Sequence, residues 1–220
     1  MKAAAILVAA GSGERLGADR PKAFVVLAGR PMLEWSIDAL RAAAIAEIVV
    51  AAPAGVAEAA PGVRTVPGGA TRSASVRAAL AAVPDGIDAV VVHDAARPLV
   101  DPALFGRTLE ALEHADAAIA AAPVTDTIKE AGADHLVRRT LDRSVLWAIQ
   151  TPQAFRREAL TRALDVDEAT LARATDDASL IERAGGQAIV VPSTARNLKV
   201  TTVFDLEVAG HLLSATIHDR

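Results

Sequence analysis

The stretch AAAILVAAGSGERLGADRPK, residues 3–22, decides how the rest of the chain is arranged. It opens with an apolar run over residues 3–10, which predicts a buried β-strand. Gly11, Gly13 and Gly17 follow directly. Because glycine has no Cβ, the backbone there can turn its N–H groups toward one point and let a ligand approach closely. The sequence therefore predicts a binding loop at the carboxyl end of a first parallel strand.

Arg15 and Lys22 supply this loop with the positive charge that phosphate oxygens require. Two familiar phosphate motifs do not fit it. Lys22 lies between a proline and Ala23, so the G-x-x-x-x-G-K-[ST] loop is absent. The three glycines are spaced one residue too widely for the dinucleotide motif G-x-G-x-x-G. The stretch is therefore either a triphosphate-binding loop of another type or a plain glycine turn with exposed basic residues.

Composition narrows the class of protein. The chain has 220 residues, of which 52% are hydrophobic and only 3% aromatic, so we expect a core of alanine and branched aliphatic side chains. A net charge of −4 and the scarcity of aromatic residues argue against a nucleic-acid partner. The absence of cysteine excludes disulfides, thiolate chemistry and cysteine-metal sites. With no apolar run of membrane-spanning length and no signal-peptide pattern, we expect a soluble, cytoplasmic protein without a membrane partner.

Strand and helix patterns alternate along most of the chain, which predicts an α/β fold with a mostly parallel sheet covered on both faces. The expected strands cover residues 3–10, 47–52, 63–66, 88–93, 117–123 and 187–191, with short extended pieces at 24–27 and 197–200. The expected helices cover residues 32–44, 71–82, 101–114, 156–164, 176–184 and 202–213, with a short, weak helix in the fifties. Asp101 and Thr175 are placed to cap two of these helices. We expect residues 1–220 to form a single domain.

The alternation breaks at residues 124–150. Two short strands, over 124–130 and 136–140, follow one another without a helix between them. A hairpin inserted into an α/β domain often reaches outward to cover a site or to hold a partner. We therefore expect a protruding β-arm at 124–150.

Several polar residues at the ends of strands and helices have both a structural and a functional interpretation. Asp94 and Arg97 follow the fourth strand and form either a turn-stabilising pair or part of a ligand site. His93 is more typical of a buried core histidine than of a ligand. Arg72, Ser73 and Ser75 either cap a helix or bind a ligand, and Thr125, Asp126 and Thr127 form either a polar strand edge or part of a site. Arg138, Arg139 and Arg143 form either a solvated basic face or part of a site. Lys199 either extends to solvent or supplies a cation to the site.

Seven motifs in order make the sequence resemble the family of 2-C-methyl-D-erythritol 4-phosphate cytidylyltransferases. They are AAGSGERLG at 9–17 with PK at 21–22, GGATRSASV at 68–76, HDAARP at 93–98, APVTDTIK at 122–129, LDRSVLWAIQTPQ at 141–153, TDDAS at 175–179 and NLKVT at 197–201. The resemblance implies a Rossmann-like nucleotidyltransferase fold with a protruding arm used in dimerisation. It also implies transfer of CMP from CTP to 2-C-methyl-D-erythritol 4-phosphate, with pyrophosphate as the other product.

The resemblance assigns roles to individual positions. Arg15 and Lys22 match residues that hold the CTP phosphates and stabilise the transition state, and Arg143 and Lys199 match residues that place the sugar phosphate for attack. The positions that match the nucleotide pocket are Ala9, Ala10, Gly11, Gly13, Gly69, Ser75 and Ala95. The positions that match the sugar-phosphate pocket are Asp94, Arg97, Thr127, Thr151 and Thr175. Ala70 departs from the family, because some members carry an acidic residue there, near the cytosine.

The implied chemistry is dominated by charge. A phosphate monoester oxygen attacks the α-phosphorus of CTP, so the protein must neutralise two polyanions and hold them in line. The nucleophile is already anionic, so no general base is required. We expect Mg²⁺ to be held mostly by phosphates, with Asp94 as its one candidate protein ligand. The resemblance also implies a homodimer joined through the arm, with sites shared between the chains. Two alternatives remain: a cytidylyltransferase for another sugar phosphate, such as ribitol 5-phosphate, and a non-catalytic nucleotide-binding module.

Overall fold

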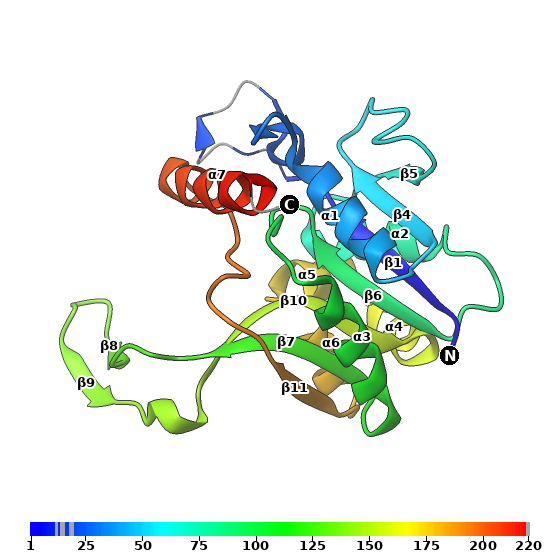
Figure 1. Ribbon diagram of the computed structural model, residues 1–220. Coiled ribbons are helices and arrows are strands. Elements are labelled where there is room, and N and C mark those ends of the chain that lie inside the picture. The colour runs from blue at the N-terminus through cyan, green and yellow to red at the C-terminus, as the bar shows by residue number, and fades with distance from the viewer. Residues whose placement is uncertain (12, 14–15, 18–19, 219–220) are drawn as a thin grey trace.

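The main element of the protein is a seven-stranded sheet. The structure is a computed structural model that describes residues 1–11, 13, 16–17 and 20–218. Across the sheet the strands lie in the order β11-β7-β10-β6-β1-β4-β5 (Figure 1). Their bounds are β1 Ala3–Val8, β4 Glu47–Ala52, β5 Arg64–Pro67, β6 Ala89–Asp94, β7 Ala117–Pro123, β10 Trp147–Arg156 and β11 Ala188–Pro192. Four of the neighbouring pairs are parallel, so the expected mostly parallel α/β sheet is confirmed.

Strand β10 was not expected from the sequence. It lies antiparallel between β6 and β7, where we had expected the end of a hairpin followed by a helix from residue 156. Its first three residues are exposed and the next six are buried. The buried part contains Gln150, Thr151 and Gln153, and these polar residues hide the apolar pattern that identifies a core strand. From Ile149 to Gln153 strand β10 advances four residues while its partner β7 advances two, so β10 carries two extra residues in a bulge.

The two faces of the sheet each have their own core, because alternate residues of a strand point to opposite faces. On β1, Ala5 and Leu7 belong to one cluster, and Ala4 and Ile6 to the other. Helices α1 (Met32–Ala42) and α3 (Pro102–Glu110) cover the first face. The second face is covered by α2 Arg72–Leu80, α4 Arg157–Leu164, α5 Glu168–Arg173 and α6 Ala178–Arg183.

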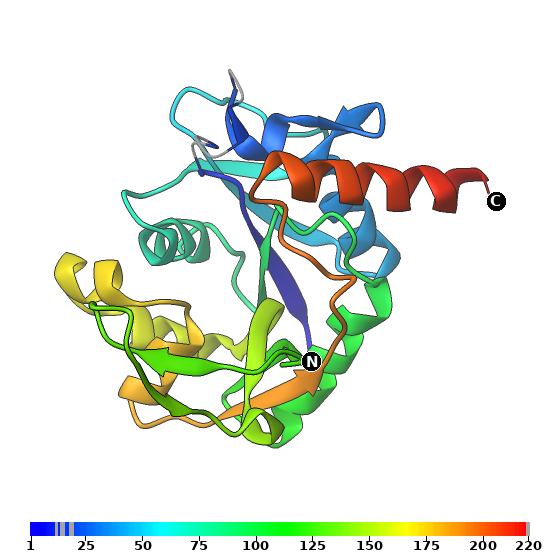
Figure 2. The same cartoon turned by 90° about the vertical axis from the view of Figure 1, so that its left-hand side faces the viewer.

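A third, smaller cluster joins helix α7 (Val203–His218) to the body beside the short strand pair β2 (Val26–Leu27) and β3 (Arg30–Pro31) (Figure 2). The helix begins with a reciprocal cap. The Asp205 backbone N–H donates to Thr202 Oγ1 (3.2 Å), and the Thr202 backbone N–H donates to Asp205 Oδ2 (2.8 Å). This cap fixes the direction in which the chain leaves the segment that carries Lys199.

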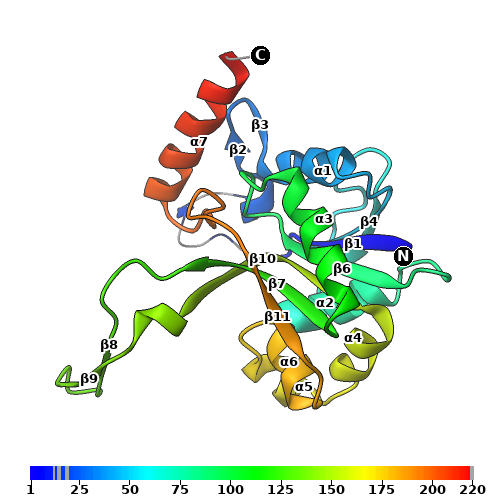
Figure 3. The ribbon, with the colours of Figure 1, turned by 60° about the horizontal axis from the view of Figure 1, so that its bottom comes forward.

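The arm lies away from the main sheet. Strands β8 (Lys129–Ala131) and β9 (Val137–Thr140) form a separate two-stranded sheet, and the short helix η4 (Arg143–Val145) leads back into β10. Figures 1 and 3 show this segment extending from the body. The first strand of the pair is shorter than expected, because residues 124–128 form no strand.

Other expectations need correction. Residues 53–63 contain no helix, residues 197–200 form no strand, and α5 was not expected. Asp101 caps α3 as predicted, with its Oδ1 accepting from the Ala103 N–H at 3.0 Å. The proposed cap by Thr175 is wrong, since α6 begins two residues later than expected and the Ser179 N–H donates to Asp176 Oδ1 (2.9 Å).

None of the helices in the described part of the chain has the length and apolar character needed to cross a membrane.

The buried end of β10 provides a stability test. Phe155 is fully buried in the second-face core, so Phe155→Ala should lower the free energy of unfolding by about 3–5 kcal/mol in urea denaturation. The matched control is Phe204→Ala, because Phe204 is 71% exposed and its loss should change stability by no more than about 0.5 kcal/mol. Equal effects of the two substitutions would show that β10 is not part of the core.

Candidate active site

A cavity of about 670 Å³ lies at the carboxyl ends of β1 and β6 and beside the start of α2. All seven positions predicted for the nucleotide pocket line it. These are Ala9, Ala10, Gly11, Gly13, Gly69, Ser75 and Ala95, together with Lys22, Asp94 and Lys199. Parallel strands in an open sheet place their ligands at this edge, as the sequence predicted. Ala70 also lines the cavity, without a charge to offer a base. Arg15 lies outside the described residues, so its role stays a prediction.

The glycine loop brings Lys22 back to the end of β1. The Lys22 backbone N–H donates to the Gly11 carbonyl (3.2 Å). Gly13 has φ +80°, and a Cβ added there would lie 3.1 Å from Lys22 backbone atoms. A larger residue would therefore push Lys22 away from the cavity or strain the loop. Gly13 therefore keeps the Lys22 backbone close to the end of β1, beside the cavity that Lys22 lines, and the phosphate-binding role of residues 3–22 stays a prediction.

The loop before α2 packs tightly against the first loop. A Cβ on Gly68 would lie 2.5 Å from the Ala10 Cβ, so only glycine permits this approach. Thr71 caps α2, accepting from the Ala74 N–H at 3.1 Å. The Ser75 hydroxyl accepts from the Gly69 N–H (3.1 Å) and donates to the Thr71 carbonyl (2.9 Å). Ser75 is thus a buried residue that fixes the loop lining the cavity.

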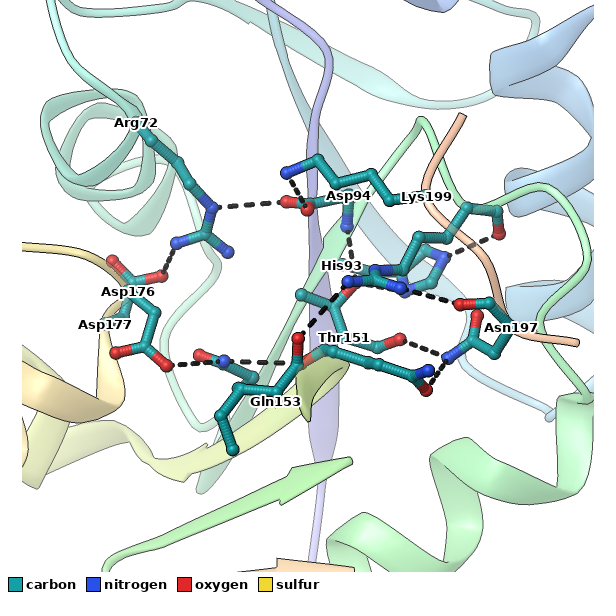
Figure 4. Close-up of polar contacts among 12 residues, drawn as sticks. Arg72, His93, Asp94, Thr151, Gln153, Asp176, Asp177, Asn197 and Lys199 are labelled. Carbon is teal, nitrogen blue, oxygen red and sulfur yellow. Dashed lines mark hydrogen bonds and ion pairs between the residues drawn. The ribbon is translucent and has the colours of Figure 1, made fainter. Parts of the chain in front are cut away.

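A second cavity, about 320 Å³, adjoins the first. It is lined by the predicted residues Asp94, Arg97, Thr151, Thr175 and Lys199, and by Arg72, Ile149, Gln150, Gln153 and Asp176. Three of these residues, Arg72, Asp94 and Lys199, line both cavities. They form the charged boundary between the two cavities (Figure 4).

Asp94 is the centre of this charged boundary. Its Oδ2 accepts from Lys199 Nζ (2.7 Å) and its Oδ1 from Arg72 Nε (3.2 Å). Burial alone would raise the pKa of this carboxyl, but the charges of Arg72 and Lys199 hold the pKa well below its usual range. Asp94 is therefore ionised. The expected alternative, a turn-stabilising pair with Arg97, holds only for the backbone, where the Arg97 N–H donates to the Asp94 carbonyl (2.9 Å). The Arg97 guanidinium donates instead to the carbonyls of Asn197 (2.6 Å) and Ile149 (3.4 Å).

Sequence reasoning missed Asp177, and it left Arg72 with two interpretations, a helix-capping or a ligand-binding residue. Arg72 Nη1 donates to Asp177 Oδ2, and Asp177 is fully buried at the start of α6. Burial alone would lower the pKa of Arg72, but the two carboxylates raise it above its ordinary value, so the guanidinium stays charged. Both residues fall in motifs of the sequence, TRSAS and TDDAS, but no local pattern shows that they meet.

His93 ties the end of β6 to β10, and it is the buried core histidine that the sequence favoured. Thr151 Oγ1 accepts from the Asp94 backbone N–H (3.0 Å) and lies 3.0 Å from His93 Nδ1. His93 Nε2 lies 3.3 Å from the Arg97 carbonyl, and the ring packs edge-on against Phe105. Since a carbonyl can only accept, the neutral tautomer with hydrogen on Nε2 satisfies both contacts.

The two predicted arm residues are not brought to this site within one chain. Thr127 and Arg143 are exposed and line neither cavity. Arg143 Nη1 instead donates to the Thr125 carbonyl in the arm itself. Their predicted roles stay predictions.

The described residues offer little to a metal ion on their own. They contain no group of three or more His, Cys, Asp or Glu side chains suited to hold one. Asp94 is the one carboxylate among the described residues lining the larger cavity, and both of its oxygens carry ion pairs. Each oxygen has a second lone pair, so Asp94 fits as one ligand of an ion that is bound mainly by a substrate.

Comparison with known proteins agrees with this geometry. The family described as 2-C-methyl-D-erythritol 4-phosphate cytidylyltransferase matches residues 3–215. A curated 2-C-methyl-D-erythritol 4-phosphate cytidylyltransferase of Synechococcus sp. strain CC9902 is 44% identical over 219 residues, covering 96% of this chain and 97% of that protein.

Two solved structures have a similar fold. The crystal structure of 4-diphosphocytidyl-2C-methyl-D-erythritol synthase from Anaerococcus prevotii matches with a TM-score of 0.83 and 30% identity. That of 2-C-methyl-D-erythritol 4-phosphate cytidylyltransferase from Thermus thermophilus matches with a TM-score of 0.82 and 34% identity. Each match covers 96% of this chain and 98% of the other.

Burial of His93 predicts a pH-dependent stability. Burial lowers the pKa of His93 to about 4, below the ordinary value of 6.5. Between these values the unfolded chain binds a proton that the folded protein does not, so stability present at pH 7 is lost as the pH falls. The loss by pH 4 is about 3 kcal/mol, from the cost of about 1.4 kcal/mol per pKa unit.

The test compares the free energy of unfolding of the wild type and His93→Gln from pH 7 to pH 4. The difference in the free energy of unfolding between the wild type and His93→Gln should shrink by about 3 kcal/mol from pH 7 to pH 4, since the other titrating groups are common to both proteins. His114→Gln, at an exposed position, is the control and should keep the wild-type profile. Parallel profiles for wild type and His93→Gln would contradict the assignment.

Proposed function

Since the chain belongs to the 2-C-methyl-D-erythritol 4-phosphate cytidylyltransferase family and transfers CMP from CTP to 2-C-methyl-D-erythritol 4-phosphate, we propose that this reaction takes place across the boundary between the two cavities. The products are 4-diphosphocytidyl-2-C-methyl-D-erythritol and pyrophosphate, and the reaction is a step of non-mevalonate isoprenoid precursor biosynthesis. The observation that carries the proposal is that Arg72, Asp94 and Lys199 line both cavities. Two anionic reactants held in them would meet beside the same charged groups.

CTP occupies the larger cavity in this proposal. The volume of this cavity suits a nucleotide, and the glycine loop that lines the cavity offers backbone N–H groups with Lys22 beside them. Arg15 is assigned to the same phosphates from the family resemblance. The base lies near the 9–11 and 68–70 loops, where Ala70 leaves its recognition to backbone groups.

The sugar phosphate occupies the smaller cavity. Lys199 supplies a cation at its edge, and Asp94, Thr175 and Gln153 supply polar groups suited to hydroxyls. Thr151 contributes by holding Asp94, because its hydroxyl already bonds to the Asp94 backbone N–H and to His93.

The chemistry follows from this placement. A phosphate oxygen of the sugar phosphate forms a bond to the α-phosphorus, and the bond from that phosphorus to the bridging oxygen breaks. The electron pair leaves with pyrophosphate, and no proton has to move. Lys22 and Lys199 stabilise the charge that builds up on the phosphate oxygens. Mg²⁺, bound by the CTP phosphates with Asp94 as its one protein ligand, would neutralise part of this charge.

The arm belongs to a homodimer in this proposal. Its exposed apolar side chains are Leu136, Val137, Val145, Trp147 and Ile149. A two-stranded hairpin is only marginally stable alone in water, and a symmetric contact with a second copy would bury these groups. The same contact would carry Thr127 and Arg143 into the partner's site. We place the reaction in the cytoplasm, where CTP is available.

The first functional test concerns Lys22. Lys22→Ala should lower kcat on the order of a hundredfold or more, because its charge acts most on the transition state. Pyrophosphate release from CTP with methylerythritol phosphate measures this. Lys2→Ala removes an exposed lysine at the opposite end of β1 and should leave the rate unchanged. Near-normal turnover in folded Lys22→Ala protein would refute the assignment.

The second test concerns shared sites. Inactive Lys22→Ala and Arg143→Ala proteins are mixed and allowed to exchange subunits. If sites are shared, each mixed dimer has one site with both defects and one with neither, so random exchange restores roughly a quarter of wild-type activity. If Arg143 serves its own chain, no activity returns. Absence of recovery, with exchange confirmed by mass spectrometry, would reject the shared site and leave the assignment of Lys22 intact.

A further inference from the structure

Arg72 has hydrogen-bond donors that are not used by any residue the structure describes. Its Nε donates to Asp94 and its Nη1 to Asp177, while Nη2 makes no hydrogen bond to any residue that the structure describes. The side chain is 24% exposed and lines both cavities. In Figure 4 Nη2 points away from Asp177, toward the part of the view in which Thr151 and Gln153 are drawn. Both of these residues line the smaller cavity.

The two carboxylates hold the guanidinium in this orientation. A guanidinium is planar with donors in fixed directions, so binding Nε and Nη1 determines where Nη2 points. Asp177 is fully buried on α6, and Asp94 is 8% exposed at the end of β6. Arg77, on the same helix, lacks this arrangement, because it contacts Glu168 and the Val166 carbonyl on the far side of α2 and lines neither cavity.

We propose that Arg72 binds the phosphate group of the sugar phosphate through Nη2, and that Asp94 and Asp177 are the residues that position it. This rests on the placement of the two substrates proposed above. Arg72 lines the smaller cavity, and phosphate oxygens form strong, charge-assisted hydrogen bonds with a guanidinium. Arg72 therefore adds a cation at the point where the attacking phosphate meets CTP. Lys199 is another cation at this cavity, whereas Lys22 lines only the larger one.

A purely structural role for Arg72 is the rival explanation. Asp177 is a buried charge, and a buried charge without a partner is strongly destabilising. Arg72 would then serve only to neutralise Asp177 and to share the charge of Asp94 with Lys199. The two explanations predict different results when the charges of Arg72 and Asp177 are removed together. If the role of Arg72 is structural, the protein should bind its substrate normally; if Arg72 binds substrate, binding of the sugar phosphate should weaken.

The test uses Asp177→Asn and the double variant Arg72→Gln/Asp177→Asn. Steady-state kinetics give KM for methylerythritol phosphate and kcat at saturating CTP, and calorimetry gives the CTP dissociation constant. The double variant should fold, because no buried charge lacks a partner. Its KM should rise tenfold to a hundredfold above that of Asp177→Asn, as expected for loss of a charged hydrogen bond. CTP affinity should stay within about threefold.

Two further variants complete the design. Arg77→Gln, the matched control on α2, should keep the wild-type KM. Arg72→Lys keeps the charge but cannot reach Asp94, Asp177 and a phosphate together, so its KM should also rise while CTP affinity holds. This variant decides the question if the double variant does not fold.

A double variant with the KM of Asp177→Asn, or an unchanged KM in Arg72→Lys, would overturn the inference. Equal losses of CTP affinity and sugar-phosphate KM would overturn it as well, because they would indicate general damage to the site. In each of these cases CMP transfer by the wild type and its loss in Lys22→Ala leave the proposed function standing. A wild-type protein without CMP transfer would overturn both.

Discussion

The buried carboxylate of Asp94 is the constraint on which the rest of the site depends. A charge at 8% exposure must be paired, and its two partners come from different parts of the chain. Arg72 brings the start of α2, and Lys199 brings the segment that leads into α7. Through Arg72 the pairing extends to Asp177 on α6. One buried ionised group thus holds together segments that are more than a hundred residues apart.

The sheet supplies the fixed frame for this pairing. Strand β6 lies near its middle, between β1 and β10, with both faces covered by packed helices. The Thr151 hydroxyl holds the Asp94 backbone N–H, and His93 holds that hydroxyl in turn. A hydroxyl between a backbone donor and a neutral imidazole has no freedom left to rotate. The position of Asp94 is therefore set by the core as well as by the charges around it.

Much of this could be predicted from the sequence, and the failures have physical causes. Parallel strands with uniform apolar runs, such as β1 and residues 89–92 of β6, are recognisable because burial on both faces favours apolar side chains at every position. β10 was missed because Gln150, Thr151 and Gln153 are buried by hydrogen bonding. The pairing of Arg72 with Asp177 spans 105 residues and follows from packing, which no local pattern records. The arm was visible as a break in the helical rhythm, though its strands are shorter than expected.

The bulge in β10 has a consequence for how this chain can change in length. Its two extra residues opposite β7 let the strand present Thr151 to Asp94 and still return to register at Gln153. Deleting one residue there would turn every following side chain to the opposite face, and deleting two would remove two of the residues Gln150, Thr151 and Pro152. An insertion at the tip between β8 and β9 meets no such restriction, since that turn is exposed. Evolution can therefore lengthen the tip of the arm freely, while the strand that anchors it must keep its residue count.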